Sequence, residues 1–280
     1  MKFLVDKSRL ESALQPILSA VPAKESPRPA LRAVHLTASE DSLLLQGSNL
    51  ELSVEVEVDS VKVDKQGSCL VPARPLGSLL HEISDPTIEL SVHKGTLKIP
   101  TSSGTFELVT SDPEGFPELD FEMDGPSVDV PIDLLVRLYS TTEFACAREA
   151  TKYAMNGVLM SIRDQQVDFV ATDGRRLAVH SAPIEADAGL ELQALLPHRS
   201  FGTALRALQG MTKELVGIRL GEGSVCLTTP DARMSIQKIL GSFPDYQAVI
   251  PRDTDNAPPS STARCSRPSL RRARRSSPMR

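Results

Sequence analysis

Apolar positions in the first 250 residues recur with two periods, one typical of helices and one of strands. From Leu10 to Val21 they return every three or four residues, which predicts an amphipathic helix. From Leu50 to Val58 they alternate with polar residues, which predicts a strand with one buried face. Further segments of both kinds follow, so the pattern predicts an α+β fold in which two helices per unit cover an antiparallel sheet.

The chain also matches itself. Val71–Leu80 lines up with Leu196–Leu205 at an offset of 125, with Pro, Arg and Gly in the same places. Val34–Ser48 matches Val158–Thr172 at an offset of 124, and Phe116–Leu119 matches Phe243–Tyr246 at 127. Several landmarks at a nearly constant offset indicate a two-fold internal repeat.

Each repeat is predicted as strand, helix, three or four strands, helix and further strands. Prolines are expected at the first turn of three helices, at Pro72, Pro131 and Pro197. Leu52–Val54 matches Leu177–Val179 at an offset of 125, which predicts one inserted residue near Gly174. A polar turn cluster at 124–127 predicts the boundary, so we expect one domain over 1–124 and a second over 125–252.

After Ile250 the apolar pattern stops. Residues 253–280 are rich in Arg, Ser and Pro and have no apolar period, so this tail is predicted to be disordered. From residue 251 the tail holds eight Arg and two Asp. The remaining 250 residues carry 23 basic and 34 acidic side chains, a net charge of −11.

This acidic balance argues against an ordinary basic nucleic-acid binder. Aromatic residues make up 4% and Trp is absent, which disfavours a single-strand binder that stacks bases. No apolar stretch is long enough to cross a bilayer and no signal peptide precedes the first strand, so we expect a cytoplasmic protein without membrane contact. Any contact with DNA must come from local placement of charge.

The sequence offers little chemistry. Four cysteines lie far apart and without metal-ligand spacing, so they are predicted to be buried thiols: Cys69, Cys146, Cys226 and Cys265. No GxSxG, HExxH or Gly-rich phosphate loop accompanies the candidate bases His81, His93, His180 and His198. We interpret Thr172-Asp173-Gly174 as a turn between strands. No catalytic residue, metal or cofactor is expected.

Four segments carry a resemblance to a known family: Met1-Lys2-Phe3, Tyr153–Leu159, Ala171–Ala178 and Phe243–Tyr246. Over residues 1 to about 255 the chain resembles the bacterial DNA sliding clamp, the beta subunit of DNA polymerase III. The resemblance implies the DNA-clamp fold, with copies of one domain arranged around a ring. A family member has three such domains, so here the tail is expected to replace the third. A genuine truncation, a frameshift and a gene-model error would give the same sequence.

The resemblance also implies a peptide groove on the second domain, which the third domain completes in the family. Its ligand is a short peptide with Leu and aromatic anchors, from the polymerase III alpha subunit or the clamp loader. The matching positions here are Met155, Thr172, Gly174, Arg175, Arg176, Leu177, Pro244 and Val249. Gly permits close backbone approach, Leu177 and Val249 supply apolar walls, and the arginines meet acidic or carbonyl groups. Position 175 is often His in the family, so Arg175 is a departure.

A clamp holds duplex DNA topologically and needs weak, sequence-independent phosphate contacts from Lys and Arg. The candidates are Lys24, Arg28, Arg74, Arg137, Arg148, Lys152 and Arg199. For each of them a solvated surface charge is the competing interpretation. Arg74 and Arg199 occupy equivalent repeat positions, which favours a functional role for that pair, whereas Glu25 and Glu149 weaken the local field.

The favoured function is therefore a processivity factor, an accessory subunit of a DNA polymerase without catalysis of its own. One alternative is a module that binds partner peptides without encircling DNA. An enzyme on a repeated α+β scaffold is disfavoured because the chain lacks an activated nucleophile or a metal set. To close a ring, Gly104–Val109 would have to pair with Ala232–Gln237, predicted as the edge of the second domain. That contact was not selected for fit, so a monomer or irregular aggregates are expected.

Overall fold

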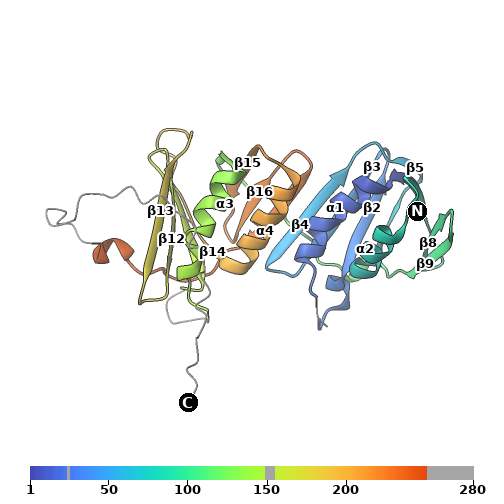
Figure 1. The fold of residues 1–280 in the computed structure, drawn as a ribbon, viewed down its shortest axis with the longest axis horizontal. Coiled ribbons are helices and arrows are strands. Elements are labelled where there is room, and N and C mark those ends of the chain that lie inside the picture. The colour runs from blue at the N-terminus through green and yellow to red at the C-terminus, as the bar shows by residue number, and fades with distance from the viewer. Residues whose placement is uncertain (24–25, 149–154, 251–280) are drawn as a thin grey trace, which may run out of the picture. The chain divides into compact units, whose positions relative to one another are not determined.

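The computed structural model describes residues 1–23, 26–148 and 155–250 (Figure 1). Met1–Pro244 forms one compact unit. Asp245–Arg280 is a second unit, whose described part holds one 3-10 turn, η4 (Tyr246–Val249). The predicted disordered tail lies outside the described residues, as do Lys24, Glu25, Glu149, Lys152 and Cys265.

The two repeats have the same order of elements, apart from one short extra strand, β5, in the first. The first repeat contains β1 (Lys2–Asp6), α1 (Lys7–Ala20), β2 (Ala33–Ser39), β3 (Ser42–Ser48), β4 (Leu52–Val58), β5 (Lys62–Lys65), β6 (Gly67–Pro72), α2 (Ala73–Glu82), β7 (Thr87–His93), β8 (Thr96–Thr101) and β9 (Gly104–Val109). The second contains β10 (Ser127–Pro131), α3 (Ile132–Ser140), β11 (Gly157–Arg163), β12 (Gln166–Thr172), β13 (Leu177–Pro183), β14 (Leu192–Pro197), α4 (His198–Met211), β15 (Leu215–Leu220), β16 (Ser224–Thr228) and β17 (Ala232–Gln237). Short 3-10 turns are η1 (Pro29–Arg32), η2 (Pro113–Gly115) and η3 (Glu143–Ala145).

The helices form where the apolar period predicts them. Leu10, Leu14 and Ile17 of α1 are buried, and Asp6 caps this helix by accepting a hydrogen bond from the backbone N–H of Arg9 at 3.0 Å. The three prolines precede their helices instead of opening them, because each is still the last residue of a strand ladder. Pro72, for example, pairs with Ala33 of β2 and has a non-helical ψ of 113°.

All strand pairs are antiparallel, and the strands form three sheets. The largest has the order β10-β15-β16-β17-β4-β3-β2-β6, four strands from each repeat. The others have the orders β5-β1-β7-β8-β9 and β13-β12-β11-β14. The prediction that Ala232–Gln237 is a free edge was wrong. It forms β17, which pairs with β4 of the first repeat from Ala232↔Val56 to Ile236↔Leu52, and this pairing joins the two repeats.

The predicted insertion near Gly174 was also wrong. In the strand registers, the turn after β3 corresponds to the turn after β12 at a constant offset of 124. In each, a residue with positive φ, Leu50 at 75° or Gly174 at 84°, stands at the same place. In each turn the preceding side chain, Asn49 or Asp173, accepts hydrogen bonds from the backbone N–H groups of the residues two and three positions further along the chain. Leu52 and Leu177 match in residue type, but they do not occupy the same position in the strand pairing.

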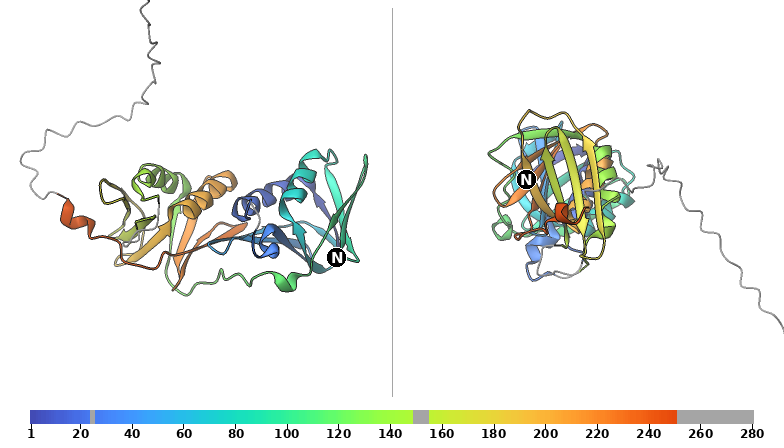
Figure 2. Two further views of the ribbon diagram at one scale, coloured as in Figure 1. Left: turned by 90° about the horizontal axis from the view of Figure 1, so that it is seen from below. Right: turned by 90° about the vertical axis from the view of Figure 1, so that its left-hand side faces the viewer.

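Four helices lie side by side in the order α2, α1, α4, α3, because α1 contacts both α2 and α4 and α4 contacts α3. Figure 1 and the left view of Figure 2 show these helices on one side of the strands. One large apolar core continues through both repeats, with Phe3, Phe169 and Phe201 fully buried. The helix layer therefore presents one continuous outer surface made by both repeats.

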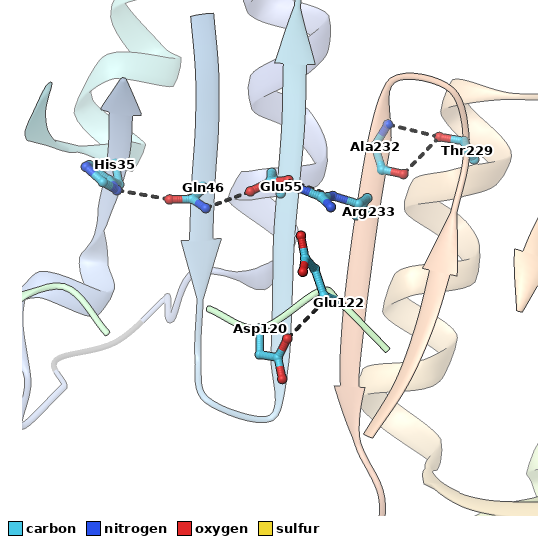
Figure 3. Close-up of polar contacts among 8 residues, drawn as sticks. All are labelled: His35, Gln46, Glu55, Asp120, Glu122, Thr229, Ala232 and Arg233. Atoms are coloured by element: carbon cyan, nitrogen blue, oxygen red, sulfur yellow. Dashed lines mark hydrogen bonds and ion pairs between the residues drawn. The ribbon is translucent and has the colours of Figure 1, made fainter. Parts of the chain in front are cut away.

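A chain of polar side chains crosses the strands at the repeat junction (Figure 3). His35 Nδ1 lies 3.0 Å from Gln46 Oε1, and Gln46 Nε2 donates to Glu55 Oε2 at 2.7 Å. Arg233 of the second repeat donates from Nε to Glu55 Oε1 at 2.8 Å and also forms an ion pair with it. Glu55 is 6% exposed. Loss of Arg233 would leave this carboxylate buried without its counter-charge, which is strongly destabilising.

His35 at the end of this chain predicts a dependence of stability on pH. Its ring is covered by Phe116, with centroids 5.2 Å apart, and faces Gln46 and Thr37. Burial lowers its pKa below the usual 6.5, while the bond to Gln46 opposes the shift. The unfolded chain therefore binds a proton more readily, so the free energy of unfolding should fall as pH drops below about 6.5 towards the folded pKa.

Urea unfolding at about pH 7.5 and about pH 5.5 measures this loss. The difference between the two values should shrink in His35→Gln. The matched control His93→Gln removes an exposed histidine at the end of β7 and should keep the full difference. An equal difference in both variants would show that His35 does not cause the loss.

Candidate functional site

The outer surface of the helix layer is basic, although the protein is acidic. The four helices hold six basic and three acidic side chains, whereas the rest of residues 1–250 holds 17 basic and 31 acidic. The exposed basic residues of the layer are Arg9, Arg74, Arg137, Arg199 and Arg206. An anionic ligand would therefore be attracted to this surface and repelled by most of the others.

The structure brings three of the predicted DNA contacts onto this layer: Arg74 on α2, Arg137 on α3 and Arg199 on α4. Arg74 and Arg199 are both the second residue of their helix, so the repeat places them equivalently. Arg28 precedes η1 and Arg148 follows η3, and both are exposed outside the helices. Lys24 and Lys152 lie outside the described residues.

Sequence reasoning missed two arginines of the layer. Arg206 follows Arg199 by seven residues, a spacing that puts both on one helical face, and this signal was available. Arg9 carried no comparable signal, because only the packing of α1 between α2 and α4 places it beside the others.

The predicted groove residues centre on the turn between β12 and β13. Thr172 Oγ1 donates to the carbonyl of Arg176 at 2.7 Å and accepts from the N–H of Gly174 at 3.1 Å. Gly174 needs its left-handed φ, and a Cβ there would lie 3.9 Å from the Met155 thioether. The structure thus brings together six predicted positions, Met155, Thr172 and 174–177.

Arg176 is held in place at this turn. Its Nε donates to Asp173 Oδ2 at 3.0 Å, and its guanidinium lies over the Phe144 ring at 5.7 Å. The pKa of Asp173 lies below its usual value, first because the backbone N–H of Arg175 donates to the carboxylate. Phe144 is 58% exposed and enlarges the apolar surface, and its place in η3 gave no sequence signal.

The remaining groove positions are less defined. Leu177 begins β13, an edge strand, and is half-buried. Pro244 ends the first unit. Val249 is 69% exposed in η4 of the second unit, so its place beside Leu177 stays a prediction.

Two of the candidate histidine bases are hydrogen-bonded within the fold, and the cysteine thiols of the described part are buried. His180 Nδ1 lies 2.6 Å from Thr141 Oγ1, and His198 Nδ1 bonds the carbonyl of Asn156 at 2.8 Å. Cys69, Cys146 and Cys226 are buried, as predicted, and burial raises their pKa values to about 11, about 12 and about 11.

Within 1–23, 26–148 and 155–250, no group of three His, Cys, Asp or Glu side chains is placed to hold a metal ion. No helix of the described part is long and apolar enough to cross a membrane.

The chain matches two consecutive domains of one family. The N-terminal domain of the DNA polymerase III beta subunit matches residues 1–120, and its central domain matches 129–245. The relatives named Beta sliding clamp include those of Chlamydia trachomatis, 28% identical, and Bacillus subtilis, 27% identical. These alignments cover 89% and 91% of this chain but 59% and 69% of the relatives.

Solved structures agree on the fold. The DNA polymerase sliding clamp of Bacillus subtilis superimposes with a TM-score of 0.85 at 25% identity, over 90% of this chain and 68% of that one. The DNA polymerase III beta subunit of Pseudomonas aeruginosa gives 0.84 at 28% identity, over 91% and 69%. The α+β class predicted from the apolar pattern and the clamp fold implied by the resemblance are thereby confirmed. Because both domain matches run in order and together cover 237 of the 280 residues, 120 and 117, this chain belongs to the DNA polymerase III beta-subunit family.

Proposed function

We propose that the chain acts as a sliding clamp, a non-catalytic processivity factor that tethers DNA polymerase III to duplex DNA in the cytoplasm. The names of its relatives support this function. The observation that carries it is the helix layer, which collects exposed arginines on one surface of an otherwise acidic protein. The chain spans 59% to 69% of the length of the relatives named above, and the division into domains at residue 124 stays a prediction.

Contacts of this kind suit sliding. Guanidinium groups neutralise phosphates without reading bases, and each such contact is weak and salt-dependent. Arg74, Arg137 and Arg199 project from three helices of one layer, so they form and break phosphate contacts without a change of fold. Arg28 and Arg148 belong to the same proposal, as do Lys24 and Lys152.

The second part of the proposal is a peptide site at the β12–β13 turn. Met155, Leu177 and the exposed Phe144 supply apolar surface, and Arg176 is held ready to meet a carbonyl or carboxylate group of a peptide. The polymerase III alpha subunit and the clamp loader are its proposed partners. This turn also supports the alternative function, a module that binds partner peptides without encircling DNA.

A charge reversal tests the helix layer. Arg74, Arg137 and Arg199 changed together to Glu should weaken binding to linear duplex and lower the slope of log affinity against log salt by about 0.9 per lost phosphate contact. Fluorescence anisotropy over a salt series measures both. The tail from residue 253 is removed from every variant, because its arginines would bind DNA by themselves.

The matched control reverses three exposed basic residues away from the helices, Lys62, Lys94 and Arg219. This control should bind nearly as the parent does, apart from a general effect of net charge. Equal losses in the two triple variants would mean that net charge alone governs binding. No loss in the helix variant would place the duplex on another surface.

A further inference from the structure

A cavity of about 680 Å³ opens in the first repeat, and the functions proposed above use two of its arginines but not the cavity itself. It lies where η1, the end of β6, the first turn of α2 and the segment after β9 meet. Its size falls within the roughly 300–1,000 Å³ of typical small-molecule sites. Five prolines, three arginines and several small or apolar residues line it.

The charged groups of the cavity favour an anion. Arg28, Arg32 and Arg74 line it, and their guanidinium groups have no ion pair or hydrogen bond with any residue that the structure describes. The acidic lining residue of the described part is Asp112, whose Oδ1 accepts the N–H of Glu114 at 3.0 Å. Three unpaired guanidinium groups match the oxygens of a phosphate group better than those of a single carboxylate.

The walls favour an organic body attached to that anion. Pro29, Pro72 and Pro75 present rigid rings, and Ala33 and Leu70 extend the apolar surface. A rigid apolar wall loses little conformational entropy when a flat ring packs on it. The α2 N-terminus beside Pro72 has no side-chain cap, and the positive end of the helix dipole adds to the attraction for an anion.

The second repeat shows that the fold does not require this cavity. Ser111 N donates to Leu70 O at 2.9 Å, and at the equivalent place Ile239 N donates to Leu195 O at 2.8 Å. The Ile239 side chain packs so closely over Gly157 that a Cβ there would lie 2.6 Å from its Cδ1. Gly157 is the counterpart of the lining residue Ala33, since both pair with the proline that precedes a helix. Ile239 thus fills in the second repeat the space that Ser111 leaves open in the first.

We infer that the cavity binds a nucleoside 5′-phosphate, with the phosphate on the arginines and the nucleoside against the prolines. A free nucleotide and the 5′-phosphorylated end of a DNA strand share this chemistry. The site shares Arg28 and Arg74 with the proposed duplex contacts, but a mononucleotide can bind it whether or not the chain is a clamp.

The test places in the cavity the isoleucine side chain that fills the equivalent space in the second repeat. Thymidine 5′-monophosphate, thymidine and inorganic phosphate are each titrated into the full chain, and binding is followed by NMR. The monophosphate should bind more tightly than either, and Ser111→Ile should abolish this binding. Arg32→Gln should weaken it by at least about tenfold. Ser68→Ile, which adds the same side chain at an exposed position of β6, should bind as the parent does.

The site would be overturned by no binding, by equal binding by the parent and Ser111→Ile, or by equal affinity for the monophosphate and inorganic phosphate. Preference for an acidic peptide over the nucleotide would overturn it as well. Competition by an oligonucleotide with a 5′-phosphate, compared with its 5′-hydroxyl form, distinguishes a strand end from a free nucleotide as the ligand. Competition by the phosphorylated form alone identifies a strand end, and competition by neither identifies a free nucleotide. Duplex binding by Ser111→Ile is measured separately, so failure of the clamp function is read independently.

Discussion

Leu177→Asp should abolish binding of a peptide with the Leu and Phe anchors of a clamp-binding motif, while the chain stays folded. Leu177 is half-buried at the start of an edge strand and borders the Gly174 turn, so an apolar anchor would lose its contact and meet a carboxylate. Loss of such a contact costs about 2 kcal/mol or more, roughly thirtyfold in Kd. Calorimetric titration of the full chain measures it.

Leu4→Asp is the matched control, because Leu4 is a 39% exposed leucine in β1 of the other repeat. It should leave peptide binding unchanged. Equal binding by the parent and Leu177→Asp would place the peptide elsewhere, and equal losses in the two variants would indicate a general effect of charge.

By itself the 280-residue chain should be a monomer or form irregular aggregates, and without a partner that completes a ring it should not stay on circular DNA. The junction inside the chain shows what a fitting contact between repeats looks like. There Ile236 lies opposite Leu52, and Arg233 lies opposite Glu55, with which it forms an ion pair. The corresponding unpaired edges, which a second copy would have to join, are β9 and β13.

The strand registers show which residues of β9 and β13 would face each other in such a contact. β9 corresponds to β17 at an offset of 128, and β13 corresponds to β4 at 124. In the same geometry Leu108 would face Arg176, and Thr105 would face Val179. The apolar pair and the ion pair of the internal junction are both replaced by mismatched pairs. Phe106 and Val109, 36% and 76% exposed on β9, then favour irregular association.

Light scattering of the chain with the tail from residue 253 removed measures the mass, and retention on nicked circles compared with linear DNA measures encirclement. A closed ring of three chains would contain six repeats. A single species of three times the chain mass that stays on circular DNA and leaves linear DNA would therefore refute this prediction. It would also show that β9 and β13 tolerate the mismatched pairs.

Features that depend on local order were predictable from the amino-acid sequence alone. Apolar periods predicted α1 and the strands around it, because burial of one face fixes the period of each element. The segments that resemble a known family implied the clamp fold and the groove, and the groove turn was predictable because residues 172–177 are neighbours along the chain. The positions of Arg74 and Arg199 followed from the repeat in the same way.

The tertiary structure decided which distant elements meet. Glu55 and Arg233 are 178 residues apart, and no local pattern distinguishes β17 as an inner strand of the junction from β17 as a free edge. The same holds for Arg9 on the helix layer, for Phe144 under Arg176 and for the space that Ser111 leaves open. An amphipathic strand or helix has the same period whichever neighbour covers it, so the choice of neighbour rests on packing between segments far apart in the chain.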